Sequence, residues 1–155
     1  MSILTANALN LFYGRFHALK SVNLSVQSST ITALIGPSGC GKSSLLRVFN
    51  RMNDLIPSVK ITGDVQAFGS SIFQMNVMEL RKRVGMVFQR PNPFPLSVFN
   101  NVAYGPRVHS SARSADMEGI VVECLSAVGL WDGLKDKLKT NALELSGEQQ
   151  QRLCI

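Results

Sequence analysis

Eight residues, Gly36-Pro37-Ser38-Gly39-Cys40-Gly41-Lys42-Ser43, decide the fold class of this 155-residue chain. They follow the spacing G-x-x-x-x-G-K-S, in which glycines precede a lysine and a hydroxyl. The stretch before them, residues 31–35, reads Ile-Thr-Ala-Leu-Ile, a short apolar run that predicts a buried strand. The segment after them is predicted to be helical, because its apolar residues share one stripe: Leu45, Val48, Phe49 and Met52. A strand, a glycine loop and a helix in this order give the motif its structural context.

This loop has the residue types that bind phosphate groups. Glycines let the backbone turn tightly and approach a ligand, and the N–H groups at the start of a helix converge on an anion. Lys42 can reach the β- and γ-phosphates, and the Ser43 hydroxyl can ligate the Mg²⁺ that bridges them. We therefore predict a site for a nucleoside triphosphate and Mg²⁺ in the loop and the first helical turn: Gly36, Pro37, Ser38, Gly39, Cys40, Gly41, Lys42, Ser43 and Ser44.

The composition is that of a globular protein, with 45% hydrophobic and 17% charged residues. No run approaches the ~18 consecutive apolar residues of a membrane span, and the N-terminus lacks the basic and apolar regions of a signal peptide. The cysteines, at positions 40, 124 and 154, lack metal-ligand spacing and are typical of a reducing cytoplasm.

The net charge of +6 raises the question of nucleic-acid binding. The densest basic run is Arg81-Lys82-Arg83, and no aromatic residue is interleaved with it. A solvated helix face or a docking rim is therefore favoured over a nucleic-acid groove.

Hydrophobic periodicity predicts an α/β chain. Residues 2–12 and 18–26 alternate with a period near two, which predicts an antiparallel β portion before the loop. Beyond the loop, strands are predicted at 60–69 and 84–88. The predicted helices are 77–83, 97–105, 114–128 with Ser114 as N-cap and Gly129 just after its end, 130–138, and 146–155 with Ser146 as N-cap.

Two residues at the ends of predicted strands each have two possible roles. Tyr13 ends the first strand, where it can stack on an adenine ring or pack at the sheet edge. Gln89 follows the strand at 84–88 and opens a proline-rich loop at 89–96. Polar residues at strand ends in α/β folds face the ligand crevice, but a glutamine can also cap a loop. The residues alone leave both questions open.

A second motif, Leu145-Ser146-Gly147-Glu148-Gln149, lies about a hundred residues after the first. Together with the loop and Gln89 it resembles the ATP-binding subunits of ABC transporters, over the whole chain. The segments 50–57, 83–95 and 101–107 are similar to the ATPases of bacterial phosphate importers. The resemblance implies an α/β fold in one incomplete nucleotide-binding domain. Its P-loop core, 1–89, would hold a parallel sheet beside the antiparallel portion, and a mostly helical subdomain, 90–155, would end in the signature helix.

The resemblance also implies roles for individual residues. Tyr13 would stack on the adenine of ATP, and Lys42 and Gln89 would be the catalytic residues. Ser43 and Gln89 would face Mg²⁺. Ser146 and Gly147 would contact the γ-phosphate of ATP held by a second subunit in a head-to-tail dimer.

Further partners are implied by the same resemblance. Transmembrane permease subunits would dock on the proline-rich loop and on residues 97–138, and a periplasmic phosphate-binding protein would act indirectly. The subunit would be an ATP-hydrolysing enzyme that powers phosphate uptake from the cytoplasmic face of the bacterial plasma membrane.

The chain departs from the family pattern in two ways. Glu148 stands where the signature has its second glycine, and we hypothesise that its carboxylate repels the γ-phosphate and weakens closure of the dimer. No apolar run followed by Asp-Glu occurs, so the acidic pair that supports Mg²⁺ and water activation is absent from the sequence. We therefore expect an N-terminal fragment of such an ATPase. The alternative is a fragment that binds nucleotide without hydrolysing it, and an ATPase acting on nucleic acid is disfavoured.

Overall fold

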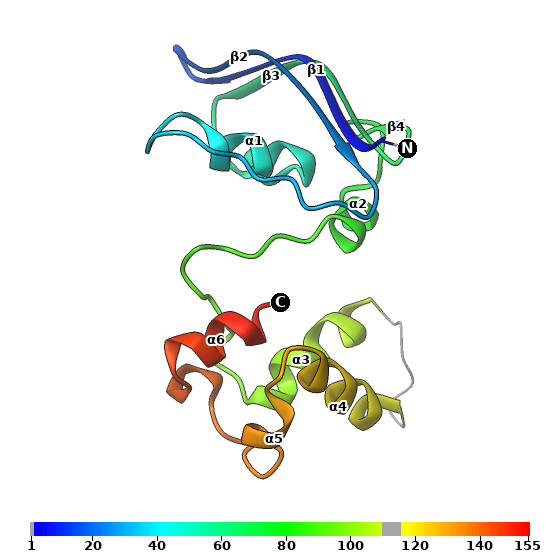
Figure 1. Ribbon diagram of the computed structural model, residues 1–155, viewed down its shortest axis with the longest axis vertical. Helices are drawn as coiled ribbons and strands as arrows, with labels where there is room; N and C mark the ends of the chain where they lie inside the picture. The colour runs from blue at the N-terminus through cyan, green and yellow to red at the C-terminus, as the bar shows by residue number, and fades with distance from the viewer. Residues whose placement is uncertain (1, 110–115) are drawn as a thin grey trace. The chain divides into compact units, whose positions relative to one another are not determined.

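The longest elements in the computed structural model of the chain are two strands of one hairpin, β1 (Ser2–Tyr13) and β2 (Phe16–Gln27). β3 (Val59–Ala67) pairs with the other edge of β1, and the two-residue β4 (Ser70–Ser71) pairs with β3. All these pairs are antiparallel, so the order in the sheet is β2-β1-β3-β4 (Figure 1). The predicted antiparallel β portion is therefore confirmed.

The structure describes residues 2–109 and 116–155, and its internal contacts divide the chain into two units, Met1–Met86 and Val87–Ile155. The first unit contains the sheet and the glycine loop, and the second is helical. The sequence analysis places this boundary three residues later, between residues 89 and 90. No helix among the described residues is long and apolar enough to span a bilayer.

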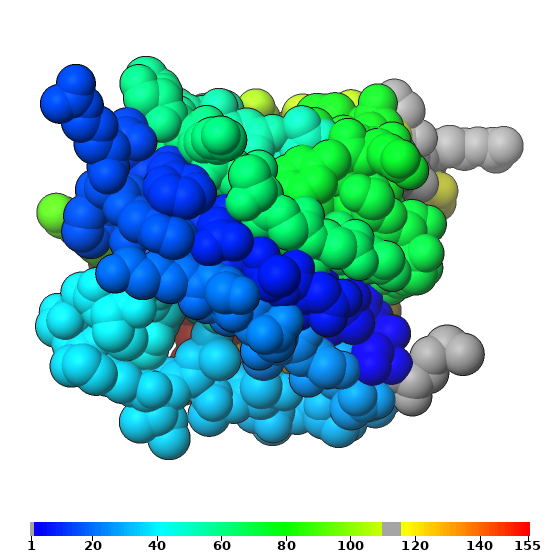
Figure 2. Space-filling view, turned by 90° about the horizontal axis from the view of Figure 1, so that it is seen from above, coloured from blue at the N-terminus to red at the C-terminus, as the bar shows by residue number. Residues whose placement is uncertain are grey.

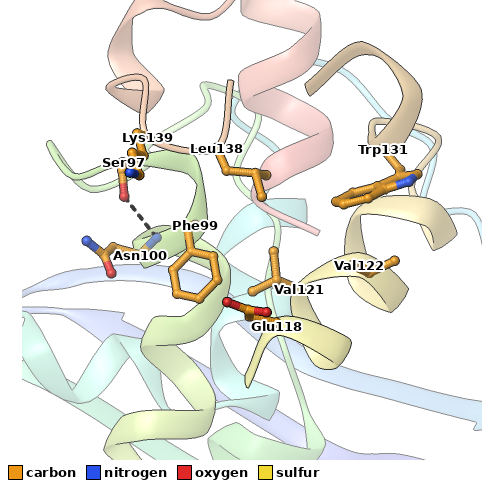
Figure 3. A pocket seen from close by; sticks show the side chains of 9 residues that line it. All are labelled: Ser97, Phe99, Asn100, Glu118, Val121, Val122, Trp131, Leu138 and Lys139. Carbon is orange, nitrogen blue, oxygen red and sulfur yellow. Dashed lines mark hydrogen bonds between the residues drawn. The ribbon is translucent and has the colours of Figure 1, made fainter. Parts of the chain in front are cut away.

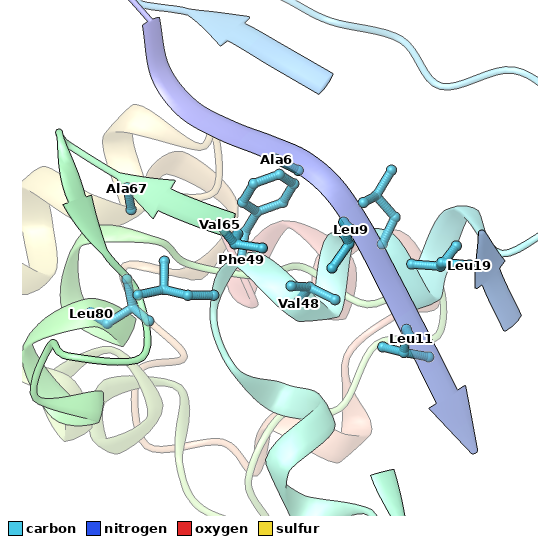
Figure 4. Packing of buried hydrophobic residues seen from close by; sticks show 11 residues of the cluster. Ala6, Leu9, Leu11, Leu19, Val48, Phe49, Val65, Ala67 and Leu80 are labelled. Atoms are coloured by element: carbon cyan, nitrogen blue, oxygen red, sulfur yellow. The ribbon is translucent and has the colours of Figure 1, made fainter. Parts of the chain in front are cut away.

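The core of the first unit lies between the sheet and helix α1 (Lys42–Phe49) (Figure 4). Val48 and Phe49 of α1 are buried against Leu9 and Leu11 of β1, as the helical stripe predicts. Burial of one such side chain stabilises the fold by roughly 1.5–3 kcal/mol. The last stripe residue, Met52, is half-buried and begins a separate 3-10 turn, η1 (Met52–Leu55). This packing fixes the helix that follows the glycine loop against the sheet.

Helix α2 (Val77–Arg83) has the predicted bounds. It begins at Asn76, whose side-chain oxygen accepts hydrogen bonds from the N–H groups of Met78 and Glu79. Leu80 on its inner face is fully buried in the same core. The asparagine cap and the buried leucine both stabilise this short helix.

The predicted strands at 31–35 and 84–88 are not formed, and this part of the prediction is wrong. Ile31 and Ile35 have exposed fractions of 101% and 95%, so the first stretch is not buried either. Figure 2 shows residues 28–40, in light blue to cyan, at the surface beside β1 and β2. A strand needs a neighbour to pair its N–H and C=O groups. No strand among the described residues pairs with either stretch, so the described part of the chain contains no parallel sheet.

The second unit is built from α3 (Val98–Val108), α4 (Met117–Ala127), α5 (Trp131–Leu134), the 3-10 turn η3 (Ala142–Glu144) and α6 (Gly147–Leu153) (Figure 1). Helices α3, α4 and α5 share one core: Val98, Ala103, Met117, Val121, Leu125, Leu130 and Leu134. Half-buried Phe99 of α3 and Leu138 (Figure 3), and Leu153 of α6, pack against this core. The predicted mostly helical subdomain is therefore confirmed.

Helix α4 ends as the sequence predicts. Gly129 has a φ of +67°, which favours glycine, and its N–H donates to the Ser126 carbonyl at 3.0 Å. The Leu130 N–H donates to the Leu125 carbonyl at 2.8 Å, which completes a Schellman motif. The predicted N-cap, Ser114, lies outside the described residues. Helix α5 is shorter than the predicted 130–138, because the chain turns at Leu134, whose carbonyl accepts a hydrogen bond from the Lys137 N–H.

Candidate nucleotide-binding site

The glycine loop lies at residues 36–41 and leads directly into α1, as the sequence predicts. Gly39 and Gly41 have φ values of +79° and +96°, a region that favours glycine. A Cβ atom on Gly41 would also lie 2.7 Å from Cδ2 of Leu19. Gly41 is the N-cap of α1, and no side chain caps this helix end. The loop therefore presents a helix N-terminus with its positive dipole end, which favours an anion.

The Lys42 side chain folds back onto the loop. Its Nζ atom donates hydrogen bonds of 2.7 Å to the carbonyl oxygens of Gly36 and of Pro37, and it lies 3.5 Å from Sγ of Cys40. The loop therefore carries a positive charge held by neutral acceptors. A phosphate at the loop offers a charged acceptor instead, which adds the attraction between opposite charges to the charge-assisted hydrogen bonds of the ammonium.

The structure connects Tyr13 to the helix after the loop. Its hydroxyl lies 3.1 Å from Oγ of Ser44 and 3.2 Å from Oδ1 of Asn53, and its single proton is donated to one of them at a time. The Tyr13 ring is half-buried and packs against the first core. Of the two roles open at the sequence level, the structure shows the packing role. Stacking on adenine stays a prediction.

Asn53 is a site residue that the sequence reasoning missed. It is fully buried, and its Nδ2 donates a 3.0 Å hydrogen bond to the Ser44 carbonyl while its Oδ1 faces Tyr13. It thereby fixes the first turn of α1 to the end of β1. A buried asparagine in a helix-breaking segment is indistinguishable from a turn residue in the sequence, so no pattern there indicates this role.

Ser43 is the residue with the right chemistry for Mg²⁺. It is exposed in the first turn of α1, next to Lys42, and Ser44 beside it is engaged with Tyr13. Among the described residues no three His, Cys, Asp or Glu side chains form a metal-binding group. Mg²⁺ at nucleotide sites keeps several waters and is held by one or two protein oxygens together with substrate phosphates. A single hydroxyl beside a phosphate-binding loop fits that mode.

The other predicted site residues belong to the second unit. Gln89 is exposed and follows the extended stretch at 84–88. Ser146 is the N-cap of α6, where its Oγ accepts the Gln149 N–H at 3.2 Å and the Gln149 Oε1 accepts the Ser146 N–H at 3.1 Å. The predicted N-cap at Ser146 is therefore confirmed, and Gln149 completes it as a reciprocal capping box. Gly147 is exposed in the first turn.

Glu148 is paired with a cation on its own helix. Its Oε1 lies 2.6 Å from Nη2 of Arg152, one turn further along, and both side chains are largely exposed. Such exposed pairs contribute little to stability, but they place the carboxylate along the helix. The sequence-based hypothesis of phosphate repulsion did not take this partner into account.

Comparison with known families now identifies the class of protein. The ABC transporter family model matches residues 19–155, so this chain belongs to the ABC transporter family. Members of the family bind ATP, which agrees with the loop.

Individual relatives are more specific. Two curated relatives are the phosphate import ATP-binding proteins PstB of Bacteroides fragilis strains ATCC 25285 and YCH46. Each is 55% identical over 152 residues, which cover 97% of this chain and 60% of the relative. A solved structure, cbiO1 from Clostridium perfringens, part of the ABC transporter complex cbiONQ, has a TM-score of 0.77 and 29% identity. The match covers 99% of this chain and 59% of that one. The chain thus spans about 60% of the length of its curated relatives.

Proposed function

We propose that the chain is the nucleotide-binding part of an ATPase subunit that powers uptake of inorganic phosphate through an ABC importer. The observation that carries the proposal is the 55% identity over 152 residues to phosphate import ATP-binding proteins. The backbone conformation of the glycine loop and the position of Lys42 support the nucleotide-binding part independently. The choice of phosphate as cargo rests on the relatives.

Binding of ATP would use the loop and the first turn of α1. Bound Mg-ATP supplies the phosphoanhydride bond whose cleavage drives transport. Lys42 would exchange the carbonyl oxygens of Gly36 and Pro37 for phosphate oxygens, and the uncapped end of α1 would orient its N–H groups toward the same anion. Ser43 would ligate Mg²⁺, and Tyr13 would lie against the base.

The second unit would complete the site in the assembled ATPase. We propose that Gln89 faces the metal or the attacking water, and that Ser146 and Gly147 contact the γ-phosphate of a nucleotide bound by a second, head-to-tail subunit. The exposure of Gln89 and Gly147 supports both roles. Ser146 uses its hydroxyl oxygen as an acceptor in the capping box, which leaves the hydroxyl proton to be donated to a phosphate.

An exposed aromatic pair supports docking on permease subunits. Phe94 and Tyr104 are 47% and 44% exposed, and their ring centroids are 4.4 Å apart. Asn101 holds the backbone of Phe94 in place, because its Oδ1 accepts the Phe94 N–H and its Nδ2 donates to the Phe94 carbonyl. Exposed apolar groups on a rigid loop are typical of protein interfaces. Such docking would place the subunit at the cytoplasmic face of the membrane, with a periplasmic phosphate-binding protein acting indirectly.

Titration calorimetry with Mg-ATP tests the proposal. The chain is expected to bind, and Lys42→Ala is expected to weaken binding by about 100-fold, because charge-assisted hydrogen bonds to phosphate are lost. Lys137→Ala is the matched control, since Lys137 is an exposed lysine of the second unit, whereas the loop belongs to the first. Equal affinities for the two variants would contradict the assignment of the loop.

Phosphate release from the same sample separates hydrolysis from binding alone. The 155 residues contain no Asp-Glu pair after an apolar run, so we expect binding with negligible release. Turnover at the rate of intact transporter ATPases, of the order of 1 s⁻¹ or more, would overturn this expectation.

A further inference from the structure

One hydrogen bond joins two distant parts of the second unit. The Nε2 atom of Gln151, on α6, donates a 2.9 Å hydrogen bond to the carbonyl oxygen of Phe88, 63 residues earlier. The Gln151 side chain is half-buried, so water competes less for this bond than at an exposed site. The acceptor belongs to the residue immediately before Gln89.

The Phe88 carbonyl lies in a stretch that has no neighbouring strand. No strand among the described residues pairs with residues 84–88. The Gln151 amide therefore provides at Phe88 the donor that a neighbouring strand would otherwise provide. The Phe88 carbonyl and the Gln89 nitrogen belong to one planar peptide unit. A hydrogen bond that fixes this oxygen therefore also fixes the orientation of the Gln89 backbone nitrogen.

Helix α6 is itself firmly attached at its other end. Three consecutive glutamines make three different sets of hydrogen bonds. Gln149 closes the capping box with Ser146, and Gln150 donates to the carbonyls of Leu143 and Leu145 at 3.1 and 2.9 Å. Gln151 reaches Phe88. Ser146 and Gln151 are five residues apart, or ~7.5 Å along a helix that rises 1.5 Å per residue.

We infer that Gln151 is a positioning residue that ties the Phe88–Gln89 peptide to α6, so that Gln89 and the Ser146–Gly147 end of the helix are placed together. The functional meaning of this link rests on the proposed function, in which Gln89 faces the metal or the attacking water and Ser146 and Gly147 face a γ-phosphate. The link itself is a property of the second unit. A displacement of α6 is transmitted to Gln89 through one side-chain amide.

Limited digestion with chymotrypsin tests the link directly, because the enzyme cleaves after phenylalanine and must withdraw the Phe88 carbonyl from Gln151. In Gln151→Glu the side chain keeps its size but an acceptor replaces the donor. We expect cleavage at Phe88–Gln89, identified by mass spectrometry, to become roughly three- to tenfold faster, as expected for the loss of one hydrogen bond. Gln151→Lys restores a donor and is expected to return the rate toward that of the unmodified chain.

Gln150→Glu is the matched control. The Gln150 side chain donates to the carbonyls of Leu143 and Leu145 and not to Phe88. Cleavage is therefore expected to rise at that turn and to stay unchanged at Phe88. Circular dichroism checks that each variant keeps its helices, and Gln151→Asn, whose amide is too short to reach, replaces Gln151→Glu if that variant is unfolded. Equal cleavage at Phe88 in the unmodified chain and the Gln151 variants, or an equal rise in Gln150→Glu, overturns the inference.

Calorimetry keeps this inference separate from the proposed function. The Gln151 variants are expected to bind Mg-ATP like the unmodified chain, because the glycine loop lies in the first unit. Failure of the unmodified chain to bind Mg-ATP contradicts the proposed function, while the cleavage comparison still decides the link.

Discussion

The N-termini of α1 and α6 are built in opposite ways. At α1 a glycine with a φ of +96° precedes the helix, no side chain caps it, and a lysine supplies positive charge. At α6 the serine and glutamine side chains cap each other, and a glutamate pairs with an arginine. The first end is arranged to receive an anion from outside the chain, whereas the second satisfies its own backbone. Two similar helix starts thus differ in how much of their hydrogen bonding the chain itself satisfies before any ligand arrives.

The largest expected effect comes from removing the glycine geometry at α1. Gly41→Ala forces a Cβ into the left-handed region and within 2.7 Å of Leu19, which is expected to cost about 2–3 kcal/mol of unfolding free energy and to weaken Mg-ATP binding. Urea unfolding and calorimetry measure the two effects. Gly105→Ala in α3, where a Cβ meets nothing within 4 Å, is expected to stabilise slightly. Equal changes in unfolding free energy and Mg-ATP affinity in both variants would show that the backbone conformation at Gly41 is not required by the loop.

A smaller effect is expected at the capped end. Ser146→Ala removes the acceptor for the Gln149 N–H and is expected to lower the free energy of unfolding by about 1 kcal/mol. Mg-ATP affinity of the single chain is expected to stay unchanged, because this end satisfies itself. A loss of affinity in the single chain, measured by calorimetry, would show that the N-terminus of α6 also takes part in nucleotide binding.

The smallest effect on stability is expected from Glu148→Gln, which removes an exposed ion pair with Arg152. The change in unfolding free energy is expected to stay below roughly 0.5 kcal/mol and to vanish in high salt. Self-association in the presence of Mg-ATP is expected to increase, because in the proposed head-to-tail dimer the change removes a negative charge beside the nucleotide phosphates. Sedimentation velocity measures this, and unchanged association would dismiss the repulsion hypothesis.

Sequence patterns predicted those features whose hydrogen bonds are local. Helix α4 and its Gly129 stop, the bounds of α2, and the N-cap at Ser146 all depend on residues a few positions apart. The glycine loop was predictable for the same reason, since its conformation depends on its own residues.

Features that depend on distant partners were not predictable in the same way. The apolar stretch at 31–35 reads as a buried strand, but burial and pairing require a neighbour that no local pattern specifies, and the stretch is exposed. The bonds from Asn53 to Ser44 and from Gln151 to Phe88 join residues 9 and 63 positions apart. In the sequence, nothing distinguishes Asn53 or Gln151 from an ordinary polar surface residue.

The folded-back Lys42 side chain has a kinetic consequence. Two short hydrogen bonds to the Gly36 and Pro37 carbonyls have to open before the ammonium reaches a phosphate. Nucleotide association then includes a side-chain rearrangement inside the protein, and because such a side chain moves within nanoseconds, this exchange does not slow the capture of ATP. The Lys42 ammonium therefore stays bonded within the loop until a charged phosphate replaces the neutral carbonyl oxygens as its acceptor.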